Sequence, residues 1–125
     1  MDFPFSEKVT ILGTEYAIIV SKKNDHYILK ETPSARGCSN FHSKQIVIKD
    51  VTDIKEDEPE EEILYAIRGM QKTLRHEIVH CFLTESGLAG NSTTASKWAC
   101  NEEMVDWIAL QGPKLAKAWE EAGAM

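Results

Sequence analysis

Two histidines four residues apart, with a glutamate directly after the first, are the residues best suited to chemistry in this chain. They occur in the run His76-Glu77-Ile78-Val79-His80. Residues four apart share one face of a helix, so both imidazoles can reach the same metal ion. Glu77 lies one step round the helix, where its carboxylate can act as general base toward a metal-bound water. The pattern predicts a hydrolytic metal site, which needs a third protein ligand from elsewhere.

A second acidic segment, Asn101-Glu102-Glu103-Met104-Val105-Asp106, offers that ligand. Glu102 and Asp106 are four apart and share a helix face. Two carboxylates on one face repel each other unless a cation or a hydrogen-bond donor lies between them. A zinc ion held by two imidazoles supplies both. We therefore predict that Glu102 binds zinc and that Asp106 accepts the free ring N–H of a ligand histidine.

Other donors compete for the third ligand position. Glu103 lies about 100° round the helix from Glu102, and Trp107 rather than a carboxylate follows it four residues on, so we expect Glu103 to be solvated. Cys81 and Cys100 are soft donors that could bind zinc. Their neighbours favour small core residues instead, and with Cys38 they form no C-x-x-C pair, so we expect reduced thiols.

Two helices are predicted to carry these motifs. The first begins near Pro59, after an acidic run, and ends at Gly87. Its apolar residues recur every three or four positions and should pack on a sheet: Ile63, Ile67, Met70, Leu74, Ile78 and Phe82.

The second helix is predicted from about Ser92–Thr94 to Gln111, with Val105 among its core residues. We expect Gly112-Pro113 to break it and a short helix, Lys114 to Ala122, to follow.

The first half of the chain is predicted to form strands. Val9–Leu12 and Glu15–Val20 flank a short connection at Gly13-Thr14, which suits a hairpin. Residues His26 to Lys30 could form a further strand, and Gln45 to Lys49 are a compact strand bounded by polar residues. We therefore expect an α+β fold, in which a small, mostly antiparallel sheet packs on the active-site helix and on a second ligand-bearing helix.

Length and charge narrow the classes of function. The 125 residues suit one domain, with a strand-rich half over 1–52 and a helical half with the metal site over 58–125. The net charge of −6 gives no general reason to bind nucleic acid or an acidic membrane. No secretory signal is visible at the start and no apolar run is long enough to span a bilayer, so we expect a cytoplasmic protein.

The two motifs together resemble the gluzincin metallopeptidases, in which H-E-x-x-H is joined by N-E-x-x-x-D on the next helix. The resemblance covers about Lys72 to Leu110 and implies a zincin-like fold. It implies that His76, His80 and Glu102 are zinc ligands and Glu77 is the catalytic base. It also implies that Asp106 supports His76 and that Asn101 orients His80. The small size and strand-rich first half further resemble prophage-encoded metallopeptidase-like proteins of the ImmA/IrrE type.

The expected function is therefore zinc-dependent hydrolysis of a peptide bond, as a gluzincin-like endopeptidase. The substrate would be a protein or peptide, such as a regulator or repressor. In zincins the substrate lies extended along a sheet edge, and Gln45 to Lys49 is the candidate edge.

Two rival functions stay open. Larger gluzincins add a distal His or Tyr that stabilises the oxyanion, and nothing after Asp106 is either residue. His26, His42, Tyr16 or Tyr27 could take that role only from the strand half. One rival is a non-catalytic zincin-like phage or prophage protein that uses zinc structurally or binds a regulator. The other is a metal-dependent hydrolase of a non-peptide amide.

Overall fold

The first two strands form a hairpin closed by a two-residue turn. Strand β1 spans Lys8–Ile11 and β2 spans Thr14–Lys22, and they pair antiparallel with Ile11 opposite Thr14. The turn residues Leu12 and Gly13 both have positive φ, 49° and 87°, as the two central residues of a type I′ turn require. The predicted hairpin is confirmed, with its connection one residue earlier than expected.

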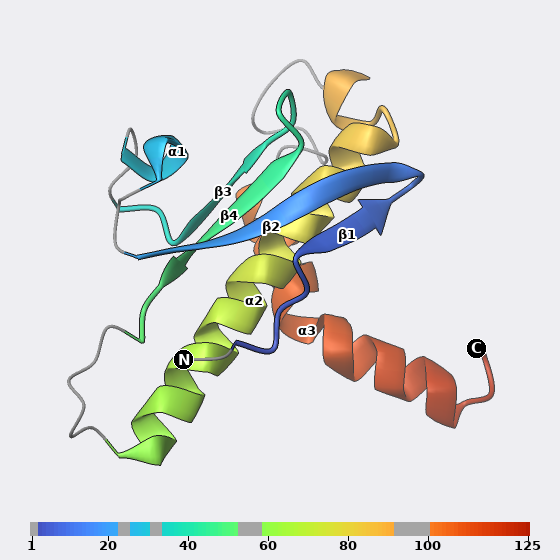
Figure 1. Cartoon of the computed structure of the whole chain (residues 1–125). Coiled ribbons are helices and arrows are strands. Elements are labelled where there is room, and N and C mark those ends of the chain that lie inside the picture. The colour runs from blue at the N-terminus through green and yellow to red at the C-terminus, as the bar shows by residue number, and fades with distance from the viewer. Residues whose placement is uncertain (1–2, 23–25, 31–33, 53–58, 92–100) are drawn as a thin grey trace.

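The computed structural model describes residues 3–22, 26–30, 34–52, 59–91 and 101–125 (Figure 1). After the hairpin come α1 (Tyr27–Lys30), β3 (Gly37–Asn40), β4 (Gln45–Asp50), α2 (Glu60–Glu85), the short 3₁₀ helix η1 (Ala89–Asn91) and α3 (Glu102–Glu121). The described strands all precede the two long helices, in an α+β fold. None of the described helices is long and apolar enough to cross a membrane.

The four described strands form a mixed sheet in the order β1-β2-β4-β3. Both outer pairs are antiparallel, but the central pair, β2 and β4, is parallel. The expectation of a mostly antiparallel sheet therefore misses the central pairing. The order also makes β3 an edge strand and β4 an inner one, so the prediction that Gln45 to Lys49 forms the edge is wrong. Ile46, Val47 and Ile48 are fully buried, as in a strand covered on both faces.

Helix α2 covers one face of the sheet, where the main core lies (Figure 1). Ile46 and Ile48 of β4 meet Met70, Leu74 and Ile78 of α2 there. On the opposite face, Leu29 of α1 packs against Val47. Phe82 is 45% exposed, so its predicted place in the apolar stripe is wrong; Cys81, which is fully buried, belongs to the core instead.

Two short elements differ from the sequence prediction. Residues 27–30 form helix α1 and not a strand, and Gly37–Asn40 form strand β3, which was not predicted. Glycine and asparagine are poor strand formers, so β3 depends on its pairing with β4 and not on local propensity. For α1, burial of Leu29 outweighs the weak extended preference of a segment this short.

Helix α2 has the predicted limits. Pro59 precedes its first residue and three glutamates occupy its first turn, where carboxylates interact favourably with the helix dipole. Beyond its last residue, Gly87 has a φ of 85°, which glycine adopts without strain and which stops a helix.

Helix α3 differs from its prediction at both ends. Asn101 is its N-cap, with an extended backbone at φ −81° and ψ 109°, so no helix runs continuously from Ser92–Thr94 to Gln111. Residues 92–100 lie outside the described part of the chain. The predicted break at Gly112-Pro113 is also wrong, because α3 continues through Pro113 to Glu121.

Arg75 explains how α3 accommodates its proline. Proline lacks the N–H that would bond the carbonyl four residues earlier, which here belongs to Ala109. Arg75 Nε donates to Ala109 O at 2.7 Å. Ala109 is only 1% exposed, so water cannot readily replace that donor. Arg75 therefore compensates for Pro113 and ties α2 to α3.

Substituting Arg75 should cost stability in a way that depends on residue 113. Arg75→Met keeps the apolar stem but removes the donor, and we expect it to lower the free energy of unfolding by roughly 1–3 kcal/mol. In a Pro113→Ala background the loss should be smaller, because the new N–H can bond Ala109 O. Urea unfolding of wild type, of Arg75→Met, of Pro113→Ala and of the double variant measures both losses. Equal losses in the two backgrounds would contradict this role for Arg75.

Glu85, the last residue of α2, anchors the hairpin to the helix. Its carboxylate accepts hydrogen bonds from Tyr16 Oη at 2.7 Å, Lys44 Nζ at 2.9 Å and Thr14 Oγ1 at 3.0 Å. These donors, Tyr16 first and then Lys44, lower the pKa of Glu85 from 4.5 to about 2. Burial, followed by the hydrogen bond to Glu85, raises the pKa of Tyr16.

The lowered pKa predicts an acid-dependent loss of stability. A group with a depressed folded pKa stabilises the fold above its unfolded pKa, and that contribution is lost as the pH falls through the folded value. The difference in Tm between wild type and Glu85→Gln should therefore shrink from its full value above pH 4.5 as the pH falls toward 2. Glu120→Gln, an exposed control, should match wild type throughout. A constant difference for Glu85→Gln across that window would rule out the anchor.

Candidate metal centre

Helix α2 presents His76 and His80 one turn apart, on the side that faces Glu102 of α3 and the cavity. Their side chains are 19% and 18% exposed, and their ring centroids lie 4.8 Å apart. The two Nε2 atoms lie 3.2 Å apart. The predicted pair therefore converges on one point.

Helix α3 brings Glu102 to the same point. Glu102 Oε2 lies 3.0 Å from His76 Nε2 and 3.3 Å from His80 Nε2, and its Oε1 lies 3.1 Å from His80 Nε2. Asn101 Oδ1 accepts the Met104 backbone N–H at 2.9 Å, which caps the helix and makes Glu102 its first residue. The orientation of His80 by Asn101 stays a prediction.

The three candidate ligand atoms lie close to the spacing that a zinc ion gives its ligands, and slightly nearer to one another. Zinc in proteins is tetrahedral, with bonds of roughly 2.0–2.2 Å to nitrogen and oxygen, which places neighbouring ligand atoms about 3.3–3.5 Å apart. The spacings among the two Nε2 atoms and Glu102 Oε2 are 3.0–3.3 Å. His76, His80 and Glu102 are the group of described residues that could hold a metal ion. Two imidazoles and one carboxylate leave the fourth position of a catalytic zinc open.

Asp106 contacts the outer nitrogen of His76. Asp106 Oδ1 lies 3.3 Å from His76 Nδ1 and 2.8 Å from Lys72 Nζ. The Lys72 ammonium holds the pKa of Asp106 below its ordinary value. A carboxylate at Nδ1 favours the tautomer in which Nδ1 carries the hydrogen. The lone pair of His76 Nε2 then faces Glu102 and His80, an arrangement that a cation between them stabilises.

Glu77 lies beside the candidate ligands but contacts the sheet. It is 8% exposed, and its Oε1 accepts a hydrogen bond from Ser39 Oγ at 2.8 Å. Strand β3 comes close to α2 here, since a Cβ at Gly37 would lie 2.7 Å from Thr73 Cγ2. Gly37 has no side chain, and this allows β3 to contact α2 here.

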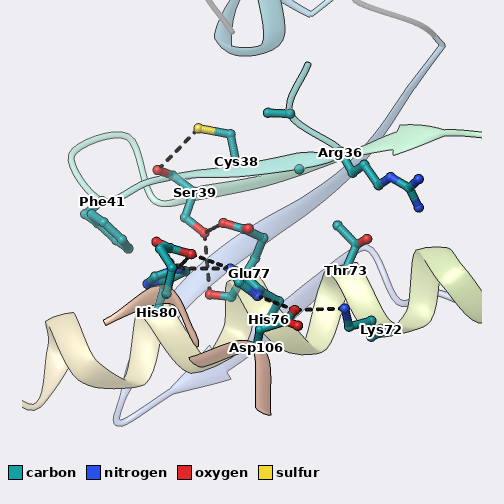
Figure 2. A pocket seen from close by; sticks show the side chains of 13 residues that line it. Arg36, Cys38, Ser39, Phe41, Lys72, Thr73, His76, Glu77, His80 and Asp106 are labelled. Atoms are coloured by element: carbon teal, nitrogen blue, oxygen red, sulfur yellow. Dashed lines mark hydrogen bonds and ion pairs between the residues drawn. The ribbon is translucent and has the colours of Figure 1, made fainter. Parts of the chain in front are cut away.

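A cavity of about 520 Å³ joins these groups (Figure 2). Its wall on one side is the segment from Ala35 to Ser39 with Phe41, and on the other the site residues of α2 and α3. Figure 2 shows Phe41 near His80 at one end of the cavity, and Arg36 above Lys72 and Thr73 at the other. Ser39 and Lys72 were not predicted from the sequence. The only sequence signal for Lys72 is its position one helical turn before His76.

The rival zinc donors differ in position. Glu103 is exposed, as expected. Cys81 is fully buried, its Sγ lies 3.8 Å from Ser39 Oγ, and burial raises the pKa of its thiol to about 11. Cys81 does not line the cavity that contains His76, His80 and Glu102. Cys38 and Cys81 are free cysteines, whereas Cys100 lies outside the described residues.

The sequence offers four candidates for stabilising the oxyanion: Tyr16, His26, Tyr27 and His42. Tyr16 is fully buried, and its hydroxyl donates a hydrogen bond to Glu85 at the C-terminal end of α2. His42 is exposed in the turn between β3 and β4. His26 precedes α1, and the side chain of Tyr27 is not described. None of the three that are described lines the cavity.

No protein-family model, curated protein or solved structure matches this chain.

Proposed function

We propose that this chain is a zinc-dependent metallopeptidase in which His76, His80 and Glu102 hold the metal and Glu77 is the general base. The observation that carries the proposal is the convergence of three ligand atoms at 3.0–3.3 Å beside a buried carboxylate. Two helices contribute the ligands, and α2 supplies both histidines and the base. The resemblance to gluzincins points to the same residues.

Each residue would have a separate task. Zinc, when bound, would act as a Lewis acid that polarises the scissile carbonyl and makes water more acidic. Glu77 would accept a proton from the attacking water and pass it to the leaving amine. Asp106 would hold His76 by its Nδ1–H, and Lys72 would keep Asp106 ionised.

Strand β3 is the better candidate for binding an extended substrate. In an antiparallel pair, alternate residues bond the partner strand and the residues between them direct N–H and C=O the other way. Lys49 N–H donates to Arg36 O at 2.8 Å, so the register directs the backbone groups of Gly37 and Ser39 away from β4. Among the described strands β3 pairs only with β4, and the cavity adjoins it. A peptide could add here as a further strand.

The test is cleavage of an unfolded protein. Zinc-loaded chain should generate new amino termini from reduced, unfolded casein. A chelator should stop cleavage, and added zinc should restore it. No new amino termini from protein that carries one zinc per chain would refute the peptidase proposal. Hydrolysis of small amides alone would favour the non-peptide rival.

The non-catalytic rival differs in what it requires of Glu77. A zinc ion used only for stability needs ligands but no base. The residue Glu77 is 8% exposed, and its carboxylate accepts a hydrogen bond from Ser39. Burying a carboxylate costs free energy, and a catalytic role accounts for keeping it beside the ligands.

A further inference from the structure

Ser39 on β3 contacts the base directly. Its Oγ lies 2.8 Å from Glu77 Oε1 and 3.5 Å from the Glu77 backbone oxygen. A carboxylate can only accept, so in the shorter contact the serine hydroxyl donates. The contact joins residues 38 positions apart, and it fixes the Glu77 side chain from the sheet and not from its own helix.

Cys81 contacts the Ser39 hydroxyl as well. Its Sγ donates to Ser39 Oγ over 3.8 Å. A hydroxyl has one hydrogen and can accept as well as donate. With the thiol as donor on one side, the hydrogen of Ser39 is left for Glu77. Cys81, Ser39 and Glu77 thus form one chain of donors and acceptors that ends on the base.

The backbone of the same serine faces the proposed substrate path. The register of β3 directs the N–H and C=O of Ser39 away from β4. Among the described residues, the side-chain donor that approaches this carbonyl is the weak Cys38 Sγ, at 3.8 Å. Ser39 lines the cavity with Glu77 and both histidines (Figure 2). The side chain of Ser39 thus contacts the proposed base, and its backbone faces the proposed substrate.

We propose that Ser39 is a positioning residue: its hydroxyl holds the Glu77 carboxylate while its backbone pairs with the substrate. One residue thereby sets the distance between the base and the scissile bond. This inference rests on the proposed peptidase function. Loss of the hydroxyl would leave substrate binding to the backbone but let the base move, and misplacement of a reacting group by about 1 Å can cost on the order of 100-fold in rate.

The experiment compares four zinc-loaded proteins: wild type, Ser39→Ala, Ser39→Thr and Ser43→Ala. Ser43 is the matched control, because its exposed hydroxyl bonds Gln45 Oε1 at 3.2 Å in the β3–β4 turn and does not line the cavity. On unfolded casein, Ser39→Ala should lose roughly 10- to 100-fold in kcat with KM little changed. Ser39→Thr keeps a hydroxyl on a residue that strands favour, so it should recover most of the loss. Ser43→Ala should match wild type.

A second readout reports on the contact itself. The side-chain carboxyl ¹³C signal of Glu77, assigned by its absence in Glu77→Gln, should shift in Ser39→Ala and not in Ser43→Ala. An unchanged kcat in Ser39→Ala, or a loss that Ser39→Thr does not recover, would overturn the positioning role while leaving the peptidase proposal intact. Absence of turnover in wild type would instead refute the peptidase proposal, and the role of Ser39 with it.

Discussion

Glu77→Gln should abolish nearly all turnover while leaving zinc bound. Glutamine keeps the size of the side chain and can still accept the hydrogen bond from Ser39, but it cannot take a proton from water. General base catalysis typically contributes roughly 10²- to 10⁴-fold, so kcat should fall by that order. The variant should carry as much zinc as wild type, since the proposed ligands are His76, His80 and Glu102.

The same variant separates an enzyme from a binding protein. Because Glu77→Gln should bind substrate without cleaving it, it should retain substrate from a cell extract for longer than wild type does. Glu103→Gln is the matched control, as the same substitution at an exposed residue of α3. If wild type and Glu77→Gln behave alike in cleavage, in partner binding and in their effect on cells, Glu77 is not a base and the non-catalytic function becomes the better account.

Glu102→Ala should lose far more zinc affinity than Glu103→Ala. Glu102 places an oxygen 3.0 Å from His76 Nε2, whereas Glu103 lies about 100° round the helix from it. Asp106→Ala should fall between them, with a loss of roughly 10- to 100-fold, typical of a partner that orients a ligand histidine. Competition with a chromophoric zinc chelator gives the three affinities. Equal losses at the two glutamates, or the reverse order, would mean that Glu102 is not the ligand.

The sequence predicts the candidate site more accurately than it predicts the sheet. Helical spacing alone predicts that His76 and His80 converge and that Glu102 and Asp106 share a face, and the distances agree. The contact between Ser39 and Glu77 could not be predicted in this way. It depends on β3, a strand of Gly-Cys-Ser-Asn that forms by pairing and has no strand signature of its own.

Helix boundaries show the same limit. The start of α2 after Pro59 and its end before Gly87 follow from local chemistry and are confirmed. The break expected at Pro113 is absent because Arg75, 34 positions from Ala109 along the chain, supplies the missing donor. A local pattern carries no information about such a distant partner, so tertiary structure overrides it.

The most direct test of the metal centre is the zinc content of the purified chain after reconstitution and removal of excess metal. The account predicts close to one zinc per chain, bound tightly enough that a chelator removes it with loss of stability, because His76, His80 and Glu102 join two helices through the ion. Elemental mass spectrometry measures that ratio. Well under half an equivalent of zinc in folded, reconstituted protein would contradict the site and the peptidase function proposed from it.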